Sequence, residues 1–177
     1  MIHNSCFYRG TPDDAKRLFQ HSSRFACARS HLHLMAATAS GEFSGAIDTD
    51  DLLKASLFTP EVVLEVLQLD LLMKVLHILD RGGYQGQQSP DELFNGLDAG
   101  TKDRVRKHYN RITAFDQCGP CADVSIDGIL EIIRSTFKEY RFYPISTFVD
   151  RQGSTAMNVA SAAMAVIHED HPEWFKN

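Results

Sequence analysis

Apolar side chains recur every three or four residues along most of this chain, and no stretch shows sustained alternation of apolar and polar positions. This spacing gathers apolar side chains on one face of an α-helix and does not fit a strand. It predicts long and short helices over residues 12 to the high thirties, 50–57, 60–80, 90–97, 101–112, 125–140 and 154–167. The sequence therefore predicts an all-α fold with about five main helices plus short helices.

Three of the predicted helices begin with the same signature, a hydroxyl residue followed by proline and an acidic residue. The three sites are Thr11-Pro12-Asp13, Thr59-Pro60-Glu61 and Ser89-Pro90-Asp91. The hydroxyl can accept from free amides of the first turn, and proline suits a position where no amide donor is needed. The acidic residue favours the positive end of the helix dipole. Ser89 together with Glu92 also fits a reciprocal capping box.

The predicted helix over 60–80 carries apolar residues around most of its circumference, so we expect it at the centre of the fold. A membrane span is excluded because polar residues interrupt the apolar run. These residues are Glu65, Gln68, Asp70, Lys74 and His77. Gly82-Gly83 ends the helix, and residues 83–88 are predicted to form a polar loop.

Length and composition fit one soluble domain. The chain has 177 residues, of which 44% are apolar and 23% charged, near the averages of globular proteins. We expect a single helical domain over residues 1–177 with a core spanning about 12–168. The formal net charge of −5 argues against a basic nucleic-acid platform, and no DNA-reading motif is present. Residues 1–6 lack the features of a secretory signal, so we expect a cytoplasmic protein with free thiols.

Three stretches together resemble the HEPN-like (higher eukaryotes and prokaryotes nucleotide-binding) family. The stretch from Leu67 to Leu76 has an acidic residue four places before a lysine, as in the central helix of that family. The stretch from Ser89 to Leu97 looks like its short Leu-Phe-x-x-Leu helix, and Phe137 to Tyr143 is similar to its aromatic–Arg–aromatic helix end. Two departures stand out, because relatives usually have Glu at the position of Asp70 and many have His at that of Gln88.

The resemblance implies an up-and-down helical bundle that often self-associates as a homodimer, with a nucleotide or RNA as a possible ligand. Asp70 and Lys74 share a helix face, and one interpretation is a polar binding site in the bundle that Arg141 also reaches. The alternative interpretation, which we favour from the sequence, is an ion pair that satisfies the polar edge of a buried helix.

Nuclease members of the family carry an Arg followed after four to six residues by a His, which supply a cation for phosphorane charge and a proton carrier. Arg104 and His108 miss this spacing by one residue. Arg24 and His31 fit the loose window, although they lie in the first long helix and the family's motif usually lies late in the chain. We therefore expect a binding or regulatory module rather than an enzyme, with a toxin-type RNase using Arg24 and His31 as the alternative.

A second alternative is a thiol oxidoreductase or metal site at Cys118-Gly119-Pro120-Cys121. The redox chemistry of this motif depends on a strand before the first thiolate, and none is predicted here. A metal would need two further ligands, for which Cys6, Cys27 and His108 are candidates. A tight inter-helix turn explains the same residues without chemistry. No cofactor and no metal are therefore expected.

Overall fold

The computed structural model of the chain describes residues 7–42, 49–86, 88–115, 125–139 and 153–176. The fold is an all-α helical bundle with one small two-stranded ribbon among the described residues. The elements in chain order are β1 (Phe7–Arg9), α1 (Pro12–Glu42), α2 (Thr49–Arg81), β2 (Gly83–Gln85), α3 (Pro90–Gly96), α4 (Ala99–Phe115), α5 (Ile126–Glu139), α6 (Gly153–Asp170) and the 3₁₀ helix η1 (Pro172–Phe175). The all-α prediction is confirmed.

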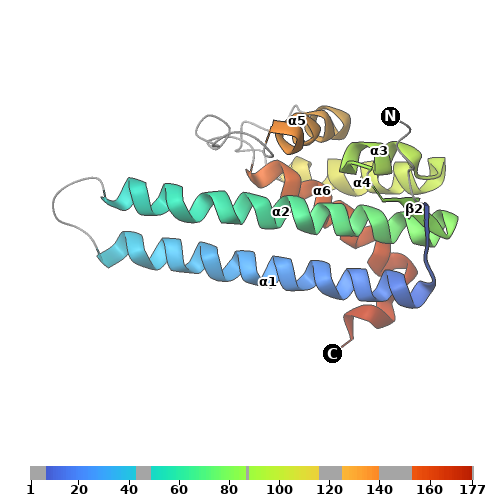
Figure 1. Cartoon of the computed structure of the whole chain (residues 1–177), viewed down its shortest axis with the longest axis horizontal. Helices are drawn as coiled ribbons and strands as arrows, with labels where there is room; N and C mark the ends of the chain where they lie inside the picture. The colour runs from blue at the N-terminus through green and yellow to red at the C-terminus, as the bar shows by residue number, and fades with distance from the viewer. Residues whose placement is uncertain (1–6, 43–48, 87, 116–124, 140–152, 177) are drawn as a thin grey trace.

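Helices α1 and α2 form a long antiparallel hairpin, and α2 is the central element (Figure 1). Besides α1, α2 contacts α6, α3 and β2, while α4 packs on α6 and α3 packs on α5. This confirms the central position expected from the apolar circumference of residues 60–80. No helix within the described ranges is long and apolar enough to cross a membrane.

The core is built mainly from the second half of α2 and from small residues on α6. On α2, Leu69, Leu72 and Met73 are fully buried. The α6 face that meets the core includes Ala162 and Ala163, also fully buried, and such short side chains allow the helices to approach closely. Buried residues from all six α-helices of the described chain belong to one cluster. The apolar stripes seen in the sequence therefore face one common core.

The expected helix start at Thr59-Pro60 is wrong, because α2 runs without interruption from Thr49 to Arg81. The two helices predicted over 50–57 and 60–80 are thus one helix. An interior proline removes one hydrogen bond and crowds the carbonyl four residues before it, but its fixed φ near −65° is helical. Helix α2 therefore continues through Pro60 where it packs along α1. Helix α1 also extends a few residues beyond its predicted end, to Glu42.

The other two predicted starts are confirmed. The Thr11 amide donates to Oδ2 of Asp14 at 2.9 Å, and the Asp14 amide donates to the Thr11 hydroxyl at 3.3 Å. The Thr11 amide and hydroxyl that donate to this carboxylate lower the pKa of Asp14. The Ser89 amide donates to Oε2 of Glu92 at 2.9 Å, which is the Glu92 half of the predicted capping box. Local capping chemistry thus sets the starts of α1 and α3.

Residues 83–85, predicted as part of a polar loop, form β2 instead. This strand pairs antiparallel with β1, with Tyr8 opposite Tyr84 and Arg9 opposite Gly83. Gly82 ends α2 with a positive φ of 70°, and its carbonyl accepts from the Gly10 amide at 3.0 Å. The ribbon forms because the antiparallel hairpin brings the start of α1 beside the end of α2 (Figure 1).

Candidate functional site

Asp70 and Lys74 lie one turn apart on α2 and form the ion pair that their spacing allows. Nζ of Lys74 donates to Oδ2 of Asp70 at 2.5 Å, and both side chains are largely buried. Burial raises the pKa of the Asp70 carboxyl, and the bond and charge of Lys74 oppose that rise. A buried carboxylate is therefore held beside a cation, close to where α2 meets the ribbon.

Two tyrosines of the ribbon extend this pair toward the surface. Nζ of Lys74 lies 5.5 Å from the centre of the Tyr84 ring, a cation–π distance. The Tyr84 ring stacks on the Tyr8 ring, with 5.5 Å between centroids and 21° between planes. Tyr8 itself is 53% exposed. We call Asp70, Lys74, Tyr84 and Tyr8 the tyrosine–lysine cluster, because successive contacts join the buried ion pair to an exposed aromatic ring.

The sequence interpretation found half of this cluster and missed Tyr8 and Tyr84. Each tyrosine lies in a three-residue strand, which is too short to show the alternation that identifies strands. A signal was nevertheless available. Tyr8 lies just before the first long helix and Tyr84 just after the second, and an antiparallel pair of such helices must bring those two positions together.

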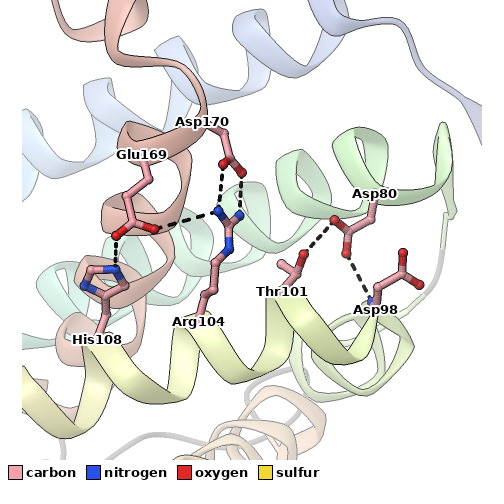
Figure 2. A network of polar contacts seen from close by, with 7 residues as sticks. All are labelled: Asp80, Asp98, Thr101, Arg104, His108, Glu169 and Asp170. Atoms are coloured by element: carbon pink, nitrogen blue, oxygen red, sulfur yellow. Dashed lines mark hydrogen bonds and ion pairs between the residues drawn. The ribbon is translucent and has the colours of Figure 1, made fainter.

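A second polar cluster joins α4 to the end of α6. Figure 2 shows Arg104 and His108 pointing from α4 toward Glu169 and Asp170. The Arg104 guanidinium makes two bonds to the Asp170 carboxylate, at 2.7 and 2.5 Å, and lies 3.7 Å from Oε2 of Glu169. Nε2 of His108 lies 2.8 Å from Oε1 of Glu169. We call these four residues the α4–α6 clamp.

The opposite charges of the clamp stabilise one another. Hydrogen bonds from Arg104 lower the pKa of Asp170, and the same bonds raise the pKa of Arg104. Both donor-bearing ends of the guanidinium already face one carboxylate, so this arginine offers little to a phosphate. Arg104 and His108, one residue short of the nuclease spacing, thus share a face but are joined to acidic side chains.

Asp80 continues the polar contacts of Figure 2 to the start of α4. Its carboxylate accepts from the Thr101 hydroxyl at 2.8 Å and from the Asp98 amide at 3.1 Å. A carboxylate at this end of α4 satisfies free amides and complements the helix dipole. Asp80 thus joins the end of α2 to the start of α4, and the clamp beside it joins the first half of α4 to the end of α6.

Arg24 and His31, the alternative nuclease pair, both lie on α1 and are exposed. Nδ1 of His31 lies 4.0 Å from Sγ of Cys27, which is also exposed. Catalysis by Arg24 and His31 stays a prediction.

The remaining candidates lie outside the described residues. These are Arg141, Cys118 and Cys121, so neither the third predicted binding residue nor the redox or metal motif is placed. Where the structure does describe side chains, no group of three or more His, Cys, Asp or Glu is arranged to hold a metal ion.

Comparison with known proteins adds no family to this picture. No family model matches the chain, no curated protein matches its sequence, and no solved structure matches its fold. The HEPN-like resemblance therefore depends on the residues that carry it, from Leu67 to Leu76, from Ser89 to Leu97 and from Phe137 to Tyr143.

Proposed function

We propose that this chain is a HEPN-like, non-catalytic module that binds a nucleotide or the bases of a short single-stranded RNA at the tyrosine–lysine cluster. The observation that carries the proposal is the continuous contact from Asp70 through Lys74 and Tyr84 to the exposed ring of Tyr8. The Asp70–Lys74 pair of this cluster is also one of the features through which the sequence resembles the HEPN-like family.

The chemistry of the cluster suits a base and its phosphate. Aromatic rings bind bases by stacking, and this contact does not depend on which base is present. Tyr8 is held in place by its stack on Tyr84, so little side-chain entropy is lost when a base binds. Arg9 leaves β1 on the face opposite Tyr8 but is exposed, and the proposal is that its long side chain reaches past the edge of the strand to a phosphate. The net charge of −5 favours such a short ligand over a long duplex.

The absence of nuclease activity is part of the proposal. Two observations support it. Arg104 is engaged by Asp170 through two bonds, and the alternative pair, Arg24 and His31, lies on an exposed helix surface rather than among core-facing residues. A cation already paired with a carboxylate contributes little to stabilising a developing phosphorane charge.

Fluorescence anisotropy with labelled single-stranded RNA, and competition by free nucleotides, tests the binding site. We expect Tyr8→Ser to weaken binding about tenfold, since stacking of one base is worth roughly 1–3 kcal/mol. Tyr8→Phe keeps the ring and should bind like the wild type. Arg9→Gln should weaken binding and reduce its salt dependence, whereas Arg111→Gln, an exposed arginine on α4, serves as the charge-matched control.

Unchanged RNA binding by a folded Tyr8→Ser variant would contradict the proposed site. Cleavage of the labelled RNA would contradict the non-catalytic half of the proposal. If cleavage occurred and disappeared in both Arg24→Gln and His31→Gln, the toxin-type RNase would be the correct interpretation.

A further inference from the structure

The outward face of α1 carries a pair of metal-binding side chains. Cys27 and His31 lie one helical turn apart, both are exposed, and Sγ of Cys27 lies 4.0 Å from Nδ1 of His31. The opposite side of the same helix buries Ala15 and Ser22. The pair therefore points away from the core of its own chain.

The geometry of this pair is close to that of two ligands on one zinc ion. Thiolate and imidazole are both common zinc ligands, and tetrahedral bonds of ordinary length place the sulfur and nitrogen roughly 3.5 Å apart. The observed separation of 4.0 Å closes to that value by a small rotation of two exposed side chains. A closed tetrahedral site needs two more ligands, and the described part of one chain offers no third His, Cys, Asp or Glu there.

We propose that Cys27 and His31 form half of an interfacial zinc site, which the same two residues of a second copy of this chain complete. A two-fold axis between antiparallel α1 helices would bring the two pairs together, because such an interface pairs one patch with itself. The complete site is Cys₂His₂. Each Cys27 thiol loses its proton to solvent when its sulfur bonds to zinc, so two protons are released for each ion bound.

The surface around the pair fits a second copy of the chain. Leu34 and Met35 lie one turn beyond His31 and are 63% and 58% exposed. At about 100° per residue, Cys27, His31, Leu34 and Met35 fall within roughly 100° of one another around the helix axis. A chelating pair beside exposed apolar side chains on one helix face is what a metal-closed, self-complementary interface requires. The inference does not depend on the proposed nucleotide site, which lies at the end of α1 that adjoins the ribbon.

Zinc titration of the reduced full-length chain, followed by light scattering after size exclusion, tests the inference. We expect a conversion from monomer to dimer that is complete at one zinc ion per two chains and is reversed by EDTA. Cobalt substituted for zinc should give the thiolate-to-metal charge-transfer band of a tetrahedral site. Cys27→Ser and His31→Gln should abolish both signals.

Controls separate this site from other thiols and from changes in folding. The double variant Cys118→Ser, Cys121→Ser and the variant His21→Gln, an exposed histidine of the same helix, should behave like the wild type. Leu34→Glu should weaken the zinc-dependent dimer while circular dichroism stays unchanged. A dimer that persists in EDTA, zinc bound at one ion per chain without dimerisation, or zinc-dependent dimerisation retained by Cys27→Ser would each overturn the inference.

Discussion

Replacing Arg104 with methionine tests whether the α4–α6 clamp stabilises the fold. Methionine keeps an unbranched apolar stem, although it is shorter than arginine, and removes the charge and the donors. The change breaks two bonds to Asp170, at 2.7 and 2.5 Å. It also leaves the adjacent carboxylates of Glu169 and Asp170 without the cation that both of them face. We therefore expect the single variant to be less stable than the wild type. We also expect a double-mutant cycle to show a favourable coupling energy between Arg104 and Asp170.

The magnitude follows from the geometry and the exposure of the pair. A hydrogen bond to a charged group contributes roughly 1.5–3 kcal/mol, whereas an exposed ion pair contributes about 0.2–1 kcal/mol. Arg104 and Asp170 are 37% and 40% exposed, so solvent screening keeps the value near that of exposed pairs. The two-bond geometry places it at the upper end of that range. We expect Arg104→Met to lower the free energy of unfolding by about 1 kcal/mol, with a coupling energy to Asp170 of similar size.

Urea unfolding at neutral pH measures this effect. The four proteins of the cycle are the wild type, Arg104→Met, Asp170→Asn and the double variant, and the urea midpoint should shift while the slope stays constant. The matched control is the cycle of Arg106 and Asp127, where the same helix makes a weaker contact at 3.2 Å with similar exposure. Its coupling energy should be below about 0.5 kcal/mol.

The pH dependence of the free energy of unfolding provides an independent test of the clamp. Because the pKa of Asp170 is lower in the folded chain than in the unfolded chain, its contribution is complete above the unfolded value, about 3.9. The contribution is lost as the pH falls through the lower folded value. A coupling energy within about 0.3 kcal/mol of zero at neutral pH, or one that does not shrink in acid, would refute the clamp.

Three further predictions concern α2 and its neighbours. Gly96→Ala should lower the free energy of unfolding by about 1–3 kcal/mol in urea. The added Cβ would lie 2.8 Å from Nε2 of buried His77, which donates to the Leu93 carbonyl at 2.7 Å; equal or higher stability would contradict this packing. Leu69→Ala, at a fully buried position, should lower the free energy of unfolding by about 2–5 kcal/mol, measured by thermal and urea unfolding. Asp70 has a raised pKa in the folded chain, so its ionisation costs stability as the pH rises from about 3.9 to that higher value. The stability of the wild type minus that of Asp70→Asn should therefore fall over this interval, and a rise would contradict the burial of Asp70.

The helical content and several boundaries of this fold are predictable from the sequence alone. The inward stripe of α5 and the caps of α1 and α3 depend on residues within one or two turns of each other, as the contact between Thr11 and Asp14 illustrates. The same local character explains the mistake at Pro60. A start signature describes which conformations a few residues favour, and it does not exclude a helix that continues upstream when a long partner such as α1 packs beside it.

The contacts of the candidate sites also divide into local ones, which the sequence predicts, and contacts between distant segments, which it does not. Asp70 and Lys74 are four residues apart on one helix, so their ion pair follows from helical geometry. Tyr8 and Tyr84 meet only because an antiparallel hairpin brings two short segments together. Arg104 meets Asp170 across 66 residues of chain, and that contact depends on how α4 and α6 pack against each other.

The sequence by itself therefore determined where most helices lie, which of their faces are apolar and which α2 side chains are paired. Only the tertiary structure decided that α2 is one helix, that a ribbon joins its end to the start of α1, and that Arg104 closes on Asp170. The physical reason is the distance along the chain over which each interaction acts. Capping and helical spacing act over a few residues, whereas the side chains that two distant helices bring together depend on how the whole core packs.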